Sequence, residues 1–131
     1  MLRAAIIDNS AIARGLLRTI LVNGGHNVIS ESGVASVKLS RLSLLAPQLV
    51  FIAYDAANED TQSALKELRT SLPKALIFAM SSESTNGMIQ QAVGDGVKGF
   101  IVKPFNAAAV LSSIRSSILK VVEQQRAETK V

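Results

Sequence analysis

Short apolar runs alternate along the chain with longer segments in which apolar residues recur every three or four positions. Four of the runs are residues 4–8 (AAIID), 26–30 (HNVIS), 49–53 (LVFIA) and 75–80 (ALIFAM), and a fifth lies within residues 94–105 (GDGVKGFIVKPF). Runs of this length predict β-strands. The run LVFIA is apolar on both faces, as expected of a central strand that helices cover on each side.

Segments with the period of a helix follow these runs. A weaker pattern over residues 86–93 predicts the fourth helix. Capping and stop residues mark the other segments: Ser10, Asn58 and Asn106 are predicted N-caps, Gly24-Gly25 ends the first helix, and Pro47 stops the second. The apolar positions that define the helices are Ile12, Leu16 and Ile20 with Leu17 and Leu21 beside them; Val37, Leu39, Leu42 and Leu45; Leu65, Leu68 and Leu72; and Val110, Ile114, Ile118 and Val121.

The pattern amounts to five strand-helix units in succession. Such an alternation predicts an α/β fold with a doubly wound parallel sheet, right-handed crossovers and helices on both faces. In open sheets of this kind, functional sites form where the strands end at their carboxyl side.

Composition narrows the class of protein. The 131 residues suffice for one domain, and no apolar run approaches the ~20 residues that cross a bilayer. The sequence contains no cysteine and does not begin with the pattern of a secretory signal, so we expect a cytoplasmic protein that does not act at a membrane. The net charge is +4, but the basic residues are spread along the chain and aromatic residues are few, which disfavours nucleic-acid binding.

Polar side chains follow four of the predicted strands, at the edge where a site is expected. Any one of them alone would be read as a cap or a solvated strand end. Together they bring carboxylate, hydroxyl and ammonium groups to one edge of the sheet. They lie in the segments Asp8-Asn9, Ala53-Tyr54-Asp55, Ser81-Ser82 and Lys103-Pro104-Phe105.

These segments resemble the receiver domain of bacterial two-component response regulators, and are similar to its stand-alone chemotaxis type. The most distinctive motif is GFIVKPF, residues 99–105, and IIDNSAIARGLL, PQLVFIA and FAMSS resemble further receiver segments. The resemblance covers about residues 1–122 as a receiver-like domain. It implies the flavodoxin-like (βα)5 fold with a five-stranded sheet in the order 2-1-3-4-5.

The resemblance also implies roles for individual positions. In working receivers, an acidic pair and an acceptor aspartate hold Mg²⁺, while a hydroxyl and a lysine contact the phosphoryl group and an aromatic residue shifts inward. Alanine has no nucleophile, so the acceptor position is degenerate here. The matching positions are Asp8 and Asn9 for the acidic pair, Ala53 for the acceptor, Ser81 for the hydroxyl, Lys103 for the lysine and Phe100 for the mobile aromatic residue, with Ser81 and Phe100 as the switch-like pair.

Asp55 is the alternative acceptor. Two residues along a strand restore the same face, but Asp55 would lie roughly 6.6 Å farther out than Ala53. Asp8 and Asp55 are the only candidate metal ligands, so we expect no cofactor, and Mg²⁺ only if Asp55 works as the acceptor. Lys103 is then either paired with Asp8 in place of the ligand or retained for structure.

The leading hypothesis is a receiver-like signalling module, not an enzyme, that acts through protein contacts without phosphorylation. One alternative is an active receiver phosphorylated on Asp55 with Mg²⁺. A second alternative is a small-molecule binder with a flavodoxin-like fold, although no glycine-rich phosphate loop is present and no catalytic group can be assembled around His26, the only histidine. The partner face implied by the resemblance comprises strand 4, helix 4, strand 5 and helix 5, and contains Met88, Gln90, Lys98, Phe100 and Arg115.

Residues 123–131 are polar and favour a helix. They are interpreted as an extension of the last helix that pairs with a second copy, as the start of a linker to an output domain, or as a fraying tail.

Overall fold

A parallel sheet with helices on both faces forms the protein. The computed structural model describes residues 2–55, 59–83 and 85–129. In chain order the elements are β1 (Arg3–Ile7), α1 (Ala11–Asn23), β2 (Asn27–Ser32), the short 3₁₀ helix η1 (Val34–Ser36), α2 (Leu39–Leu45), β3 (Leu49–Ala53), α3 (Glu59–Ser71), β4 (Leu76–Ser81), α4 (Asn86–Gly94), β5 (Gly99–Val102) and α5 (Ala107–Thr129).

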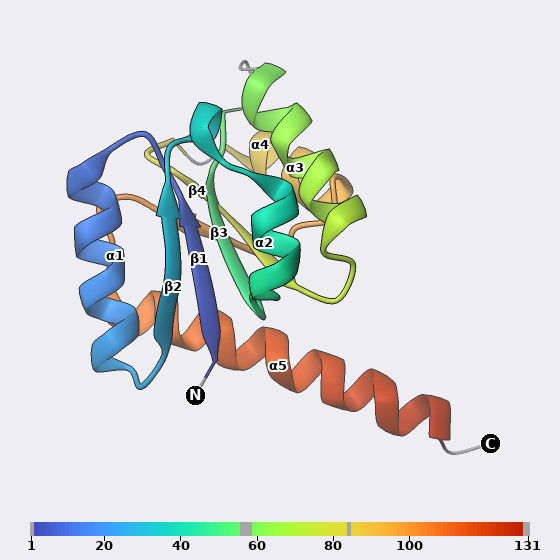
Figure 1. Cartoon of the computed structure of the whole chain (residues 1–131). Coiled ribbons are helices and arrows are strands. Elements are labelled where there is room, and N and C mark those ends of the chain that lie inside the picture. The colour runs from blue at the N-terminus through green and yellow to red at the C-terminus, as the bar shows by residue number, and fades with distance from the viewer. Residues whose placement is uncertain (1, 56–58, 84, 130–131) are drawn as a thin grey trace.

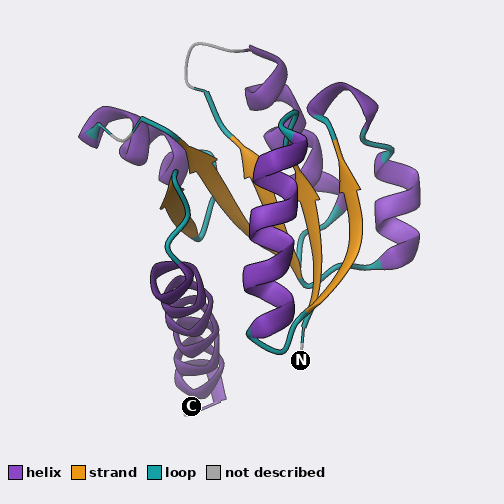
Figure 2. Ribbon diagram, turned by 90° about the vertical axis from the view of Figure 1, so that its left-hand side faces the viewer, coloured by secondary structure: helices purple, strands orange, loops and turns teal. Residues whose placement is uncertain are grey.

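The sheet has the strand order β2-β1-β3-β4-β5, and all paired strands are parallel. This confirms the predicted α/β class, the flavodoxin-like (βα)5 architecture and the order 2-1-3-4-5. All the strands point the same way, so their carboxyl ends meet along one edge (Figure 2).

Side chains of β3 alternate between the two cores that lie on opposite faces of this sheet. Val50 and Ile52 are buried with residues of α2, α3 and α4, whereas Leu49 and Phe51 are buried with residues of α1 and α5. The layers are visible in Figure 1, where α1 lies on one side of the strands and α2 and α3 on the other. Because β3 is apolar on both faces, only a central position covered by helices satisfies it.

The predicted core stripe of α1 was wrong by one position. Ile12 and Leu16 are 77% and 55% exposed, whereas Leu17 and Leu21 are fully buried and Ala13 is 9% exposed. Apolar residues at both i and i+1 cover a wide arc of the helix, so the sequence period did not decide which line faces the sheet. Ala13 has no bulk that would signal burial.

The second strand and helix also differ from the prediction in their bounds. β2 runs on to Ser32, and α2 begins only at Leu39. Val37 is not helical but extended (φ −68°, ψ 131°), although its side chain still packs against the core below α2. Gly33 and the following 3₁₀ turn separate the strand from the helix, and the apolar period alone does not reveal this interruption.

Other predicted helices were confirmed. Ser10 caps α1 through its hydroxyl, and Asn106 accepts a hydrogen bond from the Ala109 N–H at the start of α5. The weak pattern over residues 86–93 is the helix α4, which Thr85 caps. The predicted cap Asn58 lies outside the described residues.

The last helix is longer than the sheet that it covers. Val110 and Ile114 of α5 are buried, but Leu119 is 60% exposed. In Figure 1 the C-terminal part of α5 continues past the sheet without another element beside it, and Figure 2 shows it leaving the body of the molecule. The helix passes through Val122 without a break. Among the described residues, no helix is long and apolar enough to cross a membrane.

Candidate functional site

A pocket of about 280 Å³ lies at the carboxyl ends of β1, β3, β4 and β5. The parallel strands bring together residues that are far apart in the chain, as the position of the site in such sheets predicts. The pocket is lined by Asp8, Asn9, Val34, Ala53, Tyr54, Asp55, Thr61, Met80, Ser81, Ser82, Glu83, Met88 and Lys103.

Asp8 is the buried carboxylate of this pocket. The residue is 3% exposed, and both carboxylate oxygens have partners within the chain. Oδ1 accepts a hydrogen bond from the Ser10 N–H at 2.9 Å, and Oδ2 lies 2.6 Å from the ammonium nitrogen of Lys103. The carbonyl oxygen of Asp8 accepts a further hydrogen bond from Arg14. A buried carboxylate needs such partners, because burial without them costs several kcal/mol.

Lys103 reaches Asp8 from the end of β5, and 24% of its side chain is exposed. Its backbone N–H donates to the Ser81 carbonyl, which aligns the end of β5 with the end of β4. The following bond to Pro104 is cis. The sequence is compatible with two roles for this lysine, an ion pair with Asp8 and retention for structure alone. The structure contains the ion pair.

Asn9 is engaged with the backbone of the next connection. Its Oδ1 accepts a hydrogen bond from the Val34 N–H at 2.8 Å. A Cβ on Gly33 would lie 2.8 Å from that same oxygen, so the glycine makes room for the contact. Asn9 therefore ties the end of β1 to the turn after β2.

Ala53 and Asp55 both line the pocket, but from different places. Ala53 is the last residue of β3 and is half-buried, whereas Asp55 is exposed and follows the end of the strand. The backbone of Asp55 is attached to α3, because its N–H donates to the Thr61 hydroxyl and its carbonyl accepts from that hydroxyl. The strand thus ends before Asp55, and the methyl group of Ala53 occupies the strand-end position.

Ser81 and Phe100 lie on neighbouring strands. The Ser81 hydroxyl accepts a hydrogen bond from the Glu83 N–H, which begins the turn after β4. Phe100 is half-buried and packs against the core beneath α3 and α4. Among the described residues, the Ser81 hydroxyl contacts the Glu83 N–H, whereas the Phe100 ring contacts Tyr54.

Tyr54 is a residue of this region whose contacts were not anticipated. It is 3% exposed, its ring meets the Phe100 ring edge-on with centroids 6.4 Å apart, and its hydroxyl lies 3.4 Å from the Asp95 carboxylate. Burial, with Asp95 as the second cause, raises the pKa of Tyr54 above its ordinary value. The available signal was alternation along β3, which turns residue 54 to the face of Val50 and Ile52.

Two residues assigned to the partner face have other surroundings. Met88 of α4 lines the strand-end pocket, and Lys98 lines a different pocket beside α3. Gln90 and Arg115 are exposed. The sequence could not separate these positions, because α4 presents one side to the pocket and another to solvent.

His26 lies just before β2, where its Nδ1 accepts a hydrogen bond from the Leu2 N–H. Burial lowers the pKa of His26. It is not among the residues that line the strand-end pocket.

The residues at the strand ends do not fit Mg²⁺ well. The ion prefers near-ideal octahedral oxygen coordination that includes carboxylates. Here Oδ2 of Asp8 faces the Lys103 ammonium group at 2.6 Å and the Ala53 side chain offers no ligand, so the exposed Asp55 beyond the end of β3 is the other carboxylate that the sequence suggested. Within residues 2–55, 59–83 and 85–129, no group of three or more His, Cys, Asp or Glu side chains could hold a metal ion.

Comparison with known proteins agrees with this architecture. The chain matches the response regulator receiver domain family over residues 4–115. It is 31% identical to the chemotaxis protein CheY of Bacillus subtilis over 116 residues, which cover 88% of this chain and 97% of that protein. The CheY of Thermotoga maritima is 28% identical over 112 residues, with coverage of 86% and 93%.

Solved structures show the same fold. A chain of the CheX-CheY-BeF3-Mg²⁺ complex from Borrelia burgdorferi superposes with a TM-score of 0.79 at 20% identity, and the match covers 89% of each chain. The family match, the 31% identity to CheY of Bacillus subtilis and the strand order together establish that this chain belongs to the response regulator receiver domain family, the signalling modules of two-component systems.

Proposed function

We propose that this receiver domain signals through protein contacts and independently of phosphorylation. The observation that carries the proposal is the ion pair between Lys103 and Asp8, at 2.6 Å, in a pocket whose acceptor position is Ala53. In the family, lysine and the acidic pair serve the phosphoryl group and Mg²⁺. Here the two side chains neutralise each other, and the strand end offers no nucleophile.

A second candidate function is phosphorylation of Asp55. It is favoured by one observation, since Asp55 lines the same pocket as Asp8, Ser81 and Lys103. Against it stand the position of Asp55 beyond the end of β3 and the attachment of its backbone to Thr61. An acceptor has to lie within bonding reach of the ligands that hold the metal and the phosphoryl group.

Incubation with Mg²⁺ and acetyl phosphate, followed by intact-mass measurement, distinguishes these functions. We expect incubation to leave the mass of the natural chain unchanged, and likewise that of Asp55→Asn. Ala53→Asp should gain one phosphoryl group, because it restores a carboxylate at the strand end. The variant Ala53→Asn is the matched control, since it adds a similar volume without a nucleophile. A phosphoryl group on the natural chain that Asp55→Asn abolishes would establish the second candidate instead.

The proposed protein contacts use the face formed by β4, α4, β5 and α5. A hollow with a volume of about 310 Å³ lies on this face beside β5. It is lined by Phe100, Ile101, Val102, Lys103, Pro104, Asn106 and Ala109. Val102 is 45% exposed there, and exposed apolar side chains next to a hollow favour a protein partner. The related Borrelia burgdorferi CheY was solved in a complex with CheX, so a protein partner has a precedent in the family.

We also propose the exposed part of α5 as a contact between two copies of the chain. Leu119 is 60% and Val122 36% exposed in the C-terminal half of α5. Light scattering during size-exclusion chromatography tests this contact. A dimer that Leu119→Glu converts to a monomer supports it, and a monomer at all concentrations contradicts it.

A further inference from the structure

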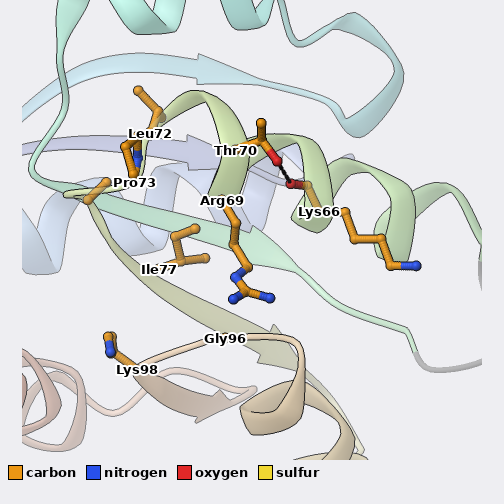
Figure 3. Close-up of a pocket in the computed structure, with 9 residues that line it drawn as sticks. Lys66, Arg69, Thr70, Leu72, Pro73, Ile77, Gly96 and Lys98 are labelled. Atoms are coloured by element: carbon orange, nitrogen blue, oxygen red, sulfur yellow. Dashed lines mark hydrogen bonds between the residues drawn. The ribbon is translucent and has the colours of Figure 1, made fainter.

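A second pocket, of about 710 Å³, lies at the opposite end of the sheet from the degenerate site (Figure 3). It is formed between the C-terminal half of α3, the beginning of β4 and the turn that leads from α4 into β5. Its lining residues are Lys66, Arg69, Thr70, Leu72, Pro73, Ala75, Ile77, Gly96 and Lys98. The volume falls within the range of roughly 300–1,000 Å³ that small-molecule sites occupy.

Three cationic side chains, Lys66, Arg69 and Lys98, surround this pocket. No acidic side chain is among the described residues that line it. Among the described residues, the ion pairs are Arg18 with Glu31 and Lys103 with Asp8, so none of the three cations lies in one. Three uncompensated positive charges around a concavity attract an anion.

Arg69 occupies the centre of the pocket. Figure 3 shows its guanidinium group extending from α3 towards the turn at Gly96, with Lys98 to one side and the Lys66 side chain extending away on the other. A Cβ on Gly96 would lie 2.2 Å from the Arg69 Nε, and Gly96 has a φ of +98°. Only glycine therefore permits both the turn and the position of the guanidinium group. A planar guanidinium group binds the oxygens of phosphate in pairs, with defined geometry.

The floor of the pocket is apolar and aliphatic. Leu72 and Ile77 are 8% and 2% exposed, and Pro73 and Ala75 complete the apolar lining. No aromatic side chain is among the described residues around it, so a nucleobase would find no ring to stack on. Cations above an aliphatic floor suit a molecule with a doubly charged head and a short aliphatic body.

We propose that this pocket binds a small organic phosphate monoester, with the phosphate on Arg69 and Lys98 and the aliphatic part over Ile77 and Leu72. A phosphate monoester carries close to two negative charges at neutral pH and matches three cations better than a single carboxylate does. The site shares no lining residue with the strand-end pocket or with the hollow around Phe100 and Val102, so the test below can fail while the proposed function holds.

The test is a titration followed by the backbone amide signals of the full chain in NMR spectra. The probes are n-butyl phosphate, inorganic phosphate and butyrate. We expect saturable shifts at Ile77, Gly96 and Lys98, with n-butyl phosphate binding about threefold to tenfold more tightly than inorganic phosphate because its methylene groups cover the floor. Butyrate should bind more weakly than n-butyl phosphate.

Variants assign the binding to the pocket. Arg69→Gln should weaken n-butyl phosphate by about tenfold or more, because a charged bidentate contact is lost. Gly96→Ala should also weaken it, by displacing the guanidinium group without removing its charge. Lys120→Gln, which removes an exposed charge on α5, is the matched control and should change the affinity less than about twofold.

Three results would overturn the proposal. The first is the absence of a saturable shift with n-butyl phosphate up to about 10 mM, since a dissociation constant above that value corresponds to a binding free energy of less than about 3 kcal/mol. The others are shifts centred on Asp8, Ser81 and Lys103 instead, and equal weakening by Arg69→Gln and Lys120→Gln. If Gly96→Ala does not fold, Arg69→Gln decides alone, since Arg69 is exposed and its removal leaves the core intact.

Discussion

Asp8 and Lys103 differ in how far water reaches them. The Asp8 side chain is 4% exposed and that of Lys103 is 24% exposed. Loss of the lysine leaves a buried carboxylate with one fewer partner, whereas loss of the carboxylate leaves an ammonium group that can turn to water. The pair is therefore asymmetric, and substitution of each partner should have a different cost.

We expect Lys103→Met to lower the free energy of unfolding by about 2–3 kcal/mol and Asp8→Asn by about 1 kcal/mol. Asparagine keeps an oxygen that can accept from the Ser10 N–H, which reduces its cost. Urea denaturation measures both values. Lys120→Met on exposed α5 is the control and should be close to neutral. A neutral Lys103→Met would contradict the structural role of the pair.

Tyr54 is the only tyrosine of the chain, so its ionisation can be followed by absorbance without interference. Because burial and Asp95 raise its pKa, the folded protein should titrate above the ordinary tyrosine value of about 10. The unfolded chain loses this proton at lower pH than the folded chain does. The contribution of Tyr54 to stability is therefore complete below about pH 10 and is lost as the pH rises through the raised pKa.

Asp95→Asn removes the acceptor charge and should move the titration midpoint of Tyr54 down towards the ordinary value. It should remain above that value, because burial is the larger cause. A midpoint at the ordinary value in the natural chain would show that the Tyr54 ring is not buried as described.

At the scale of elements, α1 shows how a helix with apolar residues on adjacent lines chooses its face. Leu17 packs into the core shared with α5, while its neighbour Leu16 is 55% exposed. Both residues are leucine and have the same helix propensity, so they form a matched pair. Only the rotation of the helix about its axis distinguishes them.

Leu17→Ala should lower the free energy of unfolding by about 3–4 kcal/mol, because it removes buried methyl groups and leaves a cavity. Leu16→Ala should stay within about 0.5 kcal/mol. Thermal or urea unfolding of both variants provides the comparison. Equal losses, or a larger loss at Leu16, would mean that the helix is rotated from the described position.

At the scale of the whole molecule, two exposed valines on different faces form a matched pair. Val102 is 45% exposed on the proposed partner face beside Phe100, and Val22 is 55% exposed on α1. The two substitutions Val102→Glu and Val22→Glu change charge and size equally. They therefore separate loss of the proposed face from a general effect of added charge.

We expect Val102→Glu to abolish retention of the proteins that the natural chain captures from extract, because a carboxylate would be buried in the contact. Val22→Glu should leave the captured set unchanged. Circular dichroism of both variants checks that they fold. Retention by Val102→Glu together with loss in Val22→Glu would move the partner face to α1.

The alternation of apolar runs and helical periods was sufficient to predict the parallel α/β sheet with helices on both faces. Strands as short and apolar as LVFIA have to be covered on both faces, and the intervening segments are long enough only for crossover helices. The topology then placed the ends of β1, β3, β4 and β5 together, which located the candidate pocket from sequence. The absence of a carboxylate at Ala53 was likewise a property of the chain that could be read directly.

Tertiary structure decided what these residues contact. Which line of α1 is buried depends on how the helix docks on the sheet. The contacts of Asp8 with Lys103 and of Asn9 with Val34 join segments that lie far apart along the chain. The contact of Tyr54 with Asp95 and the position of Arg69 over Gly96 likewise join residues that no local period connects. Sequence periodicity describes one element at a time, whereas the distances between side chains of different elements are set by packing.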